Sequence, residues 1–265
     1  MPPICGKLTH DYQVANSTSN PVTAANQLGF MEDDRTLIVV PTYNERENIG
    51  AFIARLLQVA PEADVAIVDD NSPDGTANQV QQIFGANSRV SVFTRTGPRS
   101  FGRSLLDGYR IAVERGYSRM VQLDADFSHD PRMIPAMIDA SRNADLVIGS
   151  RYCHGGRVVN WPWPRRLLSY FANRYVSLIT GLDIRDSTAG FRCWTRRALQ
   201  SLLERGVASD GYAFQIEAAF RTQRTGLRVA EVPITFTDRR AGQSKMSGKV
   251  ILEGMVKPWS LRFGR

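Results

Sequence analysis

The sequence predicts an α/β fold in which a mostly parallel central sheet carries helices on both faces. Short apolar stretches, typical of strands buried in a parallel sheet, alternate with longer segments whose apolar residues recur at helical spacing. Acidic and other polar residues follow several strands directly, at the edge where doubly wound sheets bind their ligands. The chain has no Gly-x-Gly-x-x-Gly or Walker sequence, so we do not expect a glycine-rich loop to hold a phosphate.

The first half of the chain is the more regular one. Its apolar runs predict five strands, at residues 36–40, 65–68, 90–93, 120–123 and 146–148. Apolar residues on one face predict helices between them, around residues 49–57, 80–84 and 101–115. Because strands that alternate with helices form βαβ units, these strands are expected to run parallel.

The second half mixes helices with short strands. Helical spacing is present at residues 161–180, 195–204, 212–224 and 250–263, and short strands are expected at 228–232 and 234–236. Residues 186–192 are expected to form a polar turn. Two interpretations are open for 161–180 and 250–263, which are apolar on one side with arginines and lysines nearby. They are either core helices or basic amphipathic helices that lie on a membrane.

Three regions are expected along the chain. Residues 1–34 are rich in Ser, Thr, Asn and Pro and lack periodicity, which predicts a disordered tail that activity does not require. Residues 35–248 are expected to form one α/β domain, and residues 249–265 a C-terminal amphipathic segment.

The composition favours anionic partners and a reducing compartment. The net charge of +7 suits nucleotides, phosphates, nucleic acids or an acidic membrane face. Cys5, Cys153 and Cys193 have neither disulfide nor metal spacing. No apolar run approaches the roughly 20 residues that cross a bilayer, and the N-terminus lacks a signal-peptide pattern. These features predict a cytoplasmic protein without a membrane span.

The strongest candidate site follows the strand at 120–123. The strand runs into Asp124-Ala125-Asp126, and alternate residues of an extended chain point the same way, so both carboxylates are expected to project together. Two carboxylates held that close favour a cation between them. Mg²⁺ typically binds one or two carboxylates and fills its shell with water and phosphate oxygens. Ser128 is expected to add an oxygen or to hold a water.

Other acidic residues follow neighbouring strands or precede helices. Two roles are open for Glu45, which either stabilises the first turn of its helix or contacts a ligand. One of Asp69 and Asp70 is expected to cap a turn, and Asp70 is assigned to a ribose or base. Asp130, directly before Pro131, is expected to cap a helix.

Three titratable residues carry weaker signals. His129 is expected in solvent or behind the ligand-contacting residues, rather than as a general base. Asp210 and Glu217 are either ordinary polar positions of a helix or residues that position an acceptor, and the second role is favoured.

Seven motifs, in order along the chain, give the sequence a family resemblance. They are VVPTYNE (39–45), VDDNSPDGT (68–76), DADFSHDP (124–131), GSRY (149–152), DSTAGFR (186–192), DGYAFQIE (210–217) and RRAGQSKM (239–246). Together they resemble the dolichyl- or polyprenyl-phosphate mannosyltransferases, which are inverting GT-A enzymes of glycosyltransferase family 2. The resemblance runs from about residue 36 to residue 258.

The resemblance implies a GT-A fold, the Rossmann-like fold of nucleotide-diphospho-sugar transferases, with amphipathic interface helices. It also implies a reaction, the transfer of mannose from GDP-mannose to a dolichyl or polyprenyl phosphate with Mg²⁺ or Mn²⁺. The positions that match the nucleotide-sugar site are Pro41, Tyr43, Glu45, Val68, Asp70, Asp124, Ala125, Asp126, Arg239 and Lys245. Those that match the acceptor-phosphate site are Arg151, Arg165 and Ser169, and the metal is assigned to Asp124, Asp126 and Ser128. The catalytic set is Asp124, Asp126, Arg151, Arg239 and Lys245.

Position 128 departs from some relatives, in which a longer glutamine contacts the metal. The resemblance also implies peripheral attachment to a membrane surface and no nucleic-acid partner. Some relatives carry C-terminal transmembrane helices, whereas this chain resembles the compact members, some of which need small membrane-anchoring subunits.

Other functions stay open from the sequence alone. UDP-glucose or another nucleotide-sugar is the nearest alternative donor, because base specificity rests on backbone contacts. A phosphohydrolase would use Asp124 as its nucleophile, but such enzymes carry Asp-x-Asp on their first strand, followed by Gly-Thr. A non-catalytic nucleotide-sugar binder has no need of arginines on the acceptor side. The chain lacks the Gln-x-x-Arg-Trp signature of processive polysaccharide synthases, which favours a single transfer.

Overall fold

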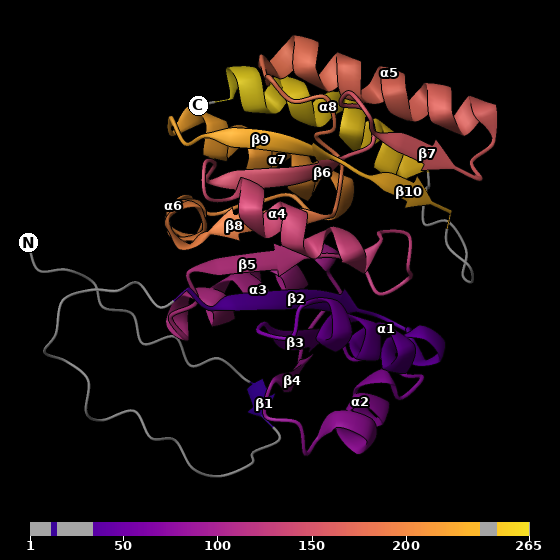
Figure 1. The fold of residues 1–265 in the computed structure, drawn as a ribbon. Helices are drawn as coiled ribbons and strands as arrows, with labels where there is room; N and C mark the ends of the chain where they lie inside the picture. Colours follow the sequence, from indigo (N-terminus) through magenta and orange to yellow (C-terminus); the bar gives the residue numbers. More distant parts are fainter. Residues whose placement is uncertain (1–11, 15–33, 239–247, 265) are drawn as a thin grey trace, which may run out of the picture.

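The computed structural model of the protein describes residues 12–14, 34–238 and 248–264 (Figure 1). An eight-stranded sheet has the strand order β1-β4-β3-β2-β5-β8-β6-β9. Its strands are β1 (Tyr12–Val14), β2 (Thr36–Thr42), β3 (Asp64–Asp69), β4 (Val90–Arg95), β5 (Arg119–Gln122), β6 (Leu146–Ser150), β8 (Arg192–Thr195) and β9 (Val229–Pro233). All run parallel except β1 and β8, so the predicted mostly parallel sheet is confirmed.

Helices cover both faces of the sheet (Figure 1). They are α1 (Arg46–Val59), α2 (Thr76–Phe84), α3 (Phe101–Glu114), α4 (Ile134–Ala140), α5 (Trp163–Thr180), α6 (Arg196–Arg205), α7 (Gly211–Arg224) and α8 (Gly248–Phe263). Leu37 and Val39 of β2 belong to the core that includes α3, α6 and α7. Ile38 and Val40 point the other way, into the core that includes α1, α2 and α4. This alternation gives the sheet two buried faces, as its continuous apolar strands predict.

Three strands were not predicted. β8 is antiparallel and lies between β5 and β6, in a segment expected to be a turn followed by a helix. It begins with Arg192, so it shows no apolar run, and only its pairing with two distant strands defines it. β7 (Arg157–Val159) pairs with β10 (Thr235–Thr237) in a separate two-stranded sheet.

The third unpredicted strand, β1, falls inside the predicted tail and pairs antiparallel with β4 at the edge of the sheet. The tail was therefore not wholly without structure. Residues 1–11 and 15–33 lie outside the described residues, so their predicted disorder stays a prediction.

The helices α5 and α8 pack against each other at one end of the sheet (Figure 1). Tyr175 links them, because its hydroxyl donates to the Met255 carbonyl at 2.9 Å and accepts from Trp259 Nε1 at 2.6 Å. The exposed large apolar residues of the pair are Trp163, Leu167, Leu168, Tyr170, Phe171, Leu178, Met255, Val256, Trp259 and Phe263. Each helix therefore packs on one side and presents an apolar face on the other. Among the described helices, none combines the length and hydropathy needed to cross a bilayer.

The carboxylates of Glu217 and Asp210 join helices. The expectation that they position an acceptor is corrected for the buried Glu217 and stays a prediction for the exposed Asp210. Glu217 is fully buried and pairs with Lys257 Nζ of α8 at 2.8 Å and with Arg221 at 2.7 Å. Asp210 caps α7 and accepts a hydrogen bond from the Gly102 N–H of α3 at 2.6 Å. Burial alone raises the pKa of Glu217, but hydrogen bonds from Lys257 and its neighbours lower it to about 2. Lys257 thus faces the core rather than a membrane.

We expect Glu217→Gln to lower the free energy of unfolding by about 2–3 kcal/mol, because it removes the carboxylate shared by Lys257 and Arg221. Urea unfolding at pH 7 measures this loss, and Glu204→Gln, an exposed change on α6, is the matched control. The pKa of Glu217 is below its ordinary value of 4.5, so its contribution is full above about pH 5 and disappears toward pH 2. The difference between the variant and the parent protein should shrink over that window, and a constant difference would contradict the assignment.

Candidate active site

Six of the predicted site residues lie on loops at the carboxyl edge of the parallel strands. Tyr43 and Glu45 follow β2, Asp70 follows β3, Asp124 and Asp126 follow β5, and Arg151 follows β6. Since β3, β2 and β5 are direct neighbours, the first five residues come together at adjacent strand ends. β8 separates β5 from β6, and its antiparallel direction brings the loop before it to the same edge.

Asp124 and Asp126 lie in the loop after β5. Asp126 Oδ1 accepts a hydrogen bond from the Ser128 N–H at 3.0 Å, across a turn in which Phe127 has a φ of +58°. A Cβ added at Gly190 would lie 3.4 Å from Asp124 Oδ2, so the loop before β8 passes close to this carboxylate. Ser128 Oγ is buried and has no hydrogen-bond partner among the described residues. The Ser128 hydroxyl and the two carboxylates of the same loop are oxygen ligands of the kind that a hard divalent cation prefers.

These oxygens do not enclose a cation by themselves. In the part of the chain that the structure describes, no three His, Cys, Asp or Glu side chains gather as a metal site. Two carboxylates and one hydroxyl leave coordination positions for water and for substrate oxygens, which is the usual arrangement for Mg²⁺ in phosphate chemistry. The residues present therefore fit a metal that is bound together with a substrate.

Asp69 caps a turn, as predicted for one of the two aspartates at the end of β3. It accepts hydrogen bonds from Thr42 Oγ1 at 2.9 Å, from the Ser72 N–H at 2.8 Å and from Ser72 Oγ at 2.6 Å. These bonds hold the loop after β3 against the end of β2.

Asp70 has a different environment. It forms a buried ion pair with Arg95 and accepts a hydrogen bond from the Ser100 N–H at 2.7 Å. Arg95 in turn contacts Asp107 of α3 through Nε at 2.8 Å. The carboxylate assigned to a ribose or base is thus already charge-paired and held in place by α3.

Tyr43 and Glu45 flank the positive-φ residue Asn44 after β2. The guanidinium carbon of Arg99 lies 3.7 Å from the centroid of the Tyr43 ring, so an arginine from the loop after β4 covers this ring. Glu45 is the N-cap residue of α1, and its side chain makes no capping hydrogen bond but accepts one from Asn48 Nδ2 at 3.1 Å. Glu45 therefore lies at the start of α1, as the first of its two predicted roles requires, and its contact with a ligand stays a prediction.

Pro41, Val68 and Ala125 line up across the same edge. Pro41 is the register partner of Val68, and both Val68 and Ala125 are buried in the core. Side chains buried in the core are poorly placed to reach a ligand. Any contact from Val68 or Ala125 would come from backbone atoms.

Arg151 is a buried arginine that is already paired with a carboxylate. Its Nε and Nη2 donate to the two oxygens of Asp186 at 2.7 and 2.6 Å, and Nη2 also donates to Thr188 Oγ1 at 2.8 Å. Three aromatic rings lie 5.3–5.6 Å from the guanidinium carbon, those of Tyr152, Trp161 and Phe236. Burial lowers the pKa of Arg151, but the charge of Asp186 more than reverses this and raises it above its ordinary value. Within the described residues Nη1 donates no hydrogen bond.

Arg165 and Ser169 lie one turn apart on α5. Arg165 pairs with Asp238 at 3.2 Å, and its guanidinium carbon lies 4.0 Å from the Trp161 ring centroid. The carbonyl of Ser169 accepts a hydrogen bond from Asn173 at 3.0 Å. Since Asn173 also contacts Thr188 at 3.3 Å, α5 is tied to the loop that carries the partner of Arg151.

His129 is buried, so of its two expected places the one in solvent is wrong and the one behind the ligand-contacting residues fits. Its ring packs 5.5 Å from Phe191 and 5.1 Å from Phe236, measured between centroids. Burial lowers the pKa of His129 to about 4. The imidazole is therefore neutral at pH 7 and a weak base. Asp130 caps the turn at Pro131–Met133 as predicted.

Two predicted residues, Arg239 and Lys245, lie outside the described residues. Three residues that contact the site were not predicted, namely Arg95, Arg99 and Asp186. The motif at 186–192 was noted in the sequence, but nothing local indicates that its aspartate pairs with Arg151. Arg95 and Arg99 are two of many arginines, and only the fold places them beside Asp70 and Tyr43.

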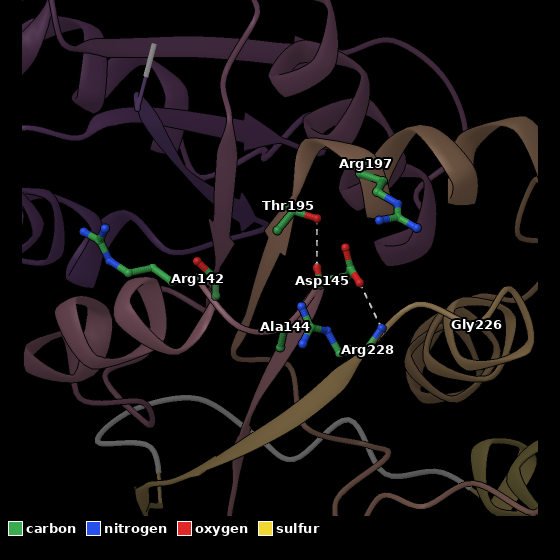
Figure 2. Close-up of a pocket in the computed structure, with 8 residues that line it drawn as sticks. Arg142, Ala144, Asp145, Thr195, Arg197, Gly226 and Arg228 are labelled. Carbon is green, nitrogen blue, oxygen red and sulfur yellow. Dashed lines mark hydrogen bonds between the residues drawn. The ribbon is translucent and has the colours of Figure 1, made fainter. Parts of the chain in front are cut away.

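A hollow of about 440 Å³ lies at the opposite edge of the sheet, where β6 and β9 begin (Figure 2). It is lined by Ser141, Arg142, Ala144, Asp145, Thr195, Arg197, Gly226 and Arg228. Asp145 is held there by the Arg228 N–H, which donates to its carboxylate at 2.9 Å. Since no predicted site residue lines this hollow, it is separate from the candidate active site.

The fold and the paired carboxylates define a protein of the GT-A class. A solved structure with the same fold is glucosyl-3-phosphoglycerate synthase from Mycobacterium tuberculosis in complex with Mn²⁺, uridine diphosphate and phosphoglyceric acid. The TM-score is 0.64 at 16% identity, and the match covers 88% of this chain and 79% of that chain. At this identity the likeness shows the fold alone.

The sequence comparisons show the family. The family model for glycosyl transferase family 2 matches residues 37–203, and the chain belongs to this family of glycosyltransferases. It is 42% identical over 222 residues to the undecaprenyl-phosphate mannosyltransferase of Micrococcus luteus, covering 84% of this chain and 91% of that protein. It is 44% identical over 232 residues to the polyprenol monophosphomannose synthase of Mycolicibacterium smegmatis, covering 86% and 88%. The predicted family and GT-A fold are confirmed.

We expect Asp186→Ala to lower the free energy of unfolding by about 3–5 kcal/mol, because it leaves the Arg151 guanidinium buried without its carboxylate. Urea unfolding measures the change. Asp183→Ala is the control, since it removes an exposed carboxylate three residues earlier in the same connection. A loss below about 1 kcal/mol for Asp186→Ala would show that Arg151 does not depend on this pair.

Proposed function

We propose that this chain transfers mannose from GDP-mannose to a polyprenyl or dolichyl phosphate and so makes polyprenyl-phosphate mannose. The observation that carries the proposal is the identity of 42% and 44% to enzymes named for this chemistry, each matched over most of its length. A paired carboxylate site and a buried arginine at the same edge of the sheet supply groups for a donor and for an anionic acceptor.

The donor site in this proposal is formed by the loops after β2, β3 and β5. Its proposed residues are Pro41, Tyr43, Glu45, Val68, Asp70, Asp124, Ala125, Asp126, Arg239 and Lys245. The geometry supports a division of tasks among them, because Tyr43 and Asp70 sit at the ends of β2 and β3, next to the carboxylates of β5. Arg239 and Lys245 are proposed to bind the diphosphate.

Asp124 and Asp126 are proposed to hold Mg²⁺ or Mn²⁺, with Ser128 as a third oxygen or the anchor of a water. When bound, the metal neutralises negative charge that develops on the leaving diphosphate. The chain itself orients Asp126 through the Ser128 N–H and keeps the loop at Gly190 in van der Waals range of Asp124.

The acceptor phosphate is proposed to be the nucleophile. A phosphate monoester has a second pKa near 6 and is largely dianionic at neutral pH, so it attacks without a general base. Cationic groups that hold this dianion are then the main requirement. Arg151, Arg165 and Ser169 are the proposed contacts, and the neutral, buried His129 fits a mechanism without a histidine base.

The exposed apolar face of α5 and α8 is proposed to meet the cytoplasmic surface of a membrane, where a polyprenyl acceptor is found. Exposed aromatic residues such as Trp163 and Phe171 favour the interface between lipid and water. A small membrane-anchoring subunit is the alternative occupant of this face.

A panel of nucleotide-sugars tests the proposed reaction. The full chain is incubated with GDP-mannose, UDP-glucose or UDP-galactose, with Mn²⁺ or Mg²⁺, and with a short polyprenyl phosphate or the matching free polyprenol. We expect transfer from GDP-mannose to the phosphate only, because the free alcohol lacks a nucleophile that reacts without a base. Transfer to the free alcohol at a comparable rate would overturn the mechanism, and a preference for UDP-glucose would replace the donor.

Asp126→Ala tests the metal site separately from turnover. We expect the variant to lose transfer and to bind GDP with the same weak affinity with and without Mn²⁺, because the paired carboxylates are broken. Calorimetry of GDP binding measures this, with Asp130→Ala as the control, since Asp130 caps a turn and pairs with the exposed Arg132. Equal GDP affinity of the parent protein in the presence and absence of Mn²⁺ would contradict the proposed site.

A further inference from the structure

A second hollow, of about 420 Å³, is lined by residues from the C-terminal parts of α6, α7 and α8. Its lining residues are Arg205, Phe220, Arg221, Arg224, Leu261, Arg262 and Gly264, and we call it the arginine hollow. The helix α7 starts at the carboxyl edge of the sheet, where Asp210 contacts Gly102, and ends shortly before β9 begins. The arginine hollow is therefore far from the paired carboxylates and shares no residue with the proposed acceptor site.

The arginine hollow carries positive charge that the fold does not neutralise. Arg221 pairs with Glu217, whose charge is also matched by Lys257. Within the described ranges, the side chains of Arg205, Arg224 and Arg262 form no hydrogen bond or ion pair, and all three are exposed. The C-terminal ends of three helices offset only about −1.5 charges in total. Four arginines therefore leave a surplus of roughly two positive charges around one cavity.

The side-chain type points to an anion that contains phosphate. The planar guanidinium group binds phosphate oxygens in pairs, which a lysine ammonium does not do. Phe220 and Leu261 supply apolar walls beside these groups. A site with both features suits a phosphate that is attached to an apolar or glycerol-like group.

The neighbours of the arginine hollow indicate where such an anion is located. Trp259 and Phe263 of α8 lie next to Leu261 and Arg262 in sequence and are 48% and 69% exposed. Their rings are stacked, with centroids 5.6 Å apart. Exposed aromatic residues beside arginines on one helix are typical of a surface that lies at the boundary between headgroups and acyl chains.

We propose that the arginine hollow binds the phosphate of an anionic membrane lipid. This inference rests on the membrane-surface part of the proposed function and adds a lipid preference to it. The apolar face of α5 and α8 would insert into the membrane, and the arginine hollow at the end of α8 would hold the lipid headgroup. The chain is then attached to the membrane at two places. Two contacts fix its orientation, so the active edge faces the membrane plane in a defined way.

Vesicle sedimentation of the full chain tests the arginine hollow. The vesicles are pure phosphatidylcholine or phosphatidylcholine with phosphatidylglycerol, and the variant is Arg224→Ala/Arg262→Ala. We expect tighter binding of the parent protein to the anionic vesicles, and a roughly tenfold loss of that binding in the variant, since each basic residue near an anionic surface contributes a several-fold gain. Binding to neutral vesicles and transfer to a short polyprenyl phosphate in detergent should not change.

The matched control is Arg142→Ala/Arg197→Ala, which removes the same charge from the hollow in Figure 2. The control hollow also faces the amino edge of the sheet, but no large apolar residue lines it, whereas Phe220 and Leu261 line the arginine hollow. We expect less than a twofold effect. If both double variants lose binding to anionic vesicles equally, the loss follows from net charge alone and the proposal is overturned.

Two further outcomes are decisive. Glycerol phosphate in solution is the first case. If it binds the parent protein as strongly as anionic vesicles do, and the Arg224→Ala/Arg262→Ala variant loses this binding, the site binds a soluble phosphate and the lipid proposal is wrong. If the parent protein shows no preference for anionic vesicles while transfer in detergent is intact, the lipid site fails and the proposed reaction survives. If the parent protein prefers anionic vesicles but shows no transfer in detergent, the lipid site survives and the proposed reaction fails.

Discussion

The bidentate ion pair between Arg151 and Asp186 is the contact on which the proposed acceptor half of the candidate active site depends. It joins the end of β6 to the loop before β8, and Thr188 and Asn173 extend the connection to α5. A buried arginine is costly to desolvate, and only a carboxylate with good geometry offsets that cost. Because the same loop passes beside Asp124 at Gly190, the pair also fixes one wall of the proposed metal site.

The donor half of the edge is built on the same principle with different residues. Asp70 is held by Arg95, and Arg95 by Asp107, so a chain of buried charges connects the end of β3 to α3. The carboxylate of the neighbouring Asp69 accepts hydrogen bonds from Ser72 in the turn that follows. The two halves meet at β5, because the loop that follows this strand carries both carboxylates of the proposed metal site.

The helices α5 and α8 illustrate how one segment combines a structural and an exposed face. Tyr175 and Lys257 fasten the pair to each other and to α7, while Phe171, Trp259 and Phe263 stay exposed. The packed sides of these helices confirm the core interpretation of their amphipathic pattern, whereas the membrane interpretation of their exposed sides stays a prediction. The arginine hollow lies where this apolar face ends, which places charge and apolar surface next to each other without any contact to the catalytic edge.

The sequence by itself determined the parallel strands, such as 36–40 and 65–68, because continuous apolar runs between helices have few other solutions. It also determined the Asp124–Asp126 pair, since both residues lie on one short segment, and the family, since seven motifs occur in order. Only the tertiary structure decided that Asp186 neutralises Arg151, that Lys257 pairs with Glu217, and that β8 inserts between β5 and β6. Those features depend on partners that are tens of residues apart in sequence, and no local periodicity records them.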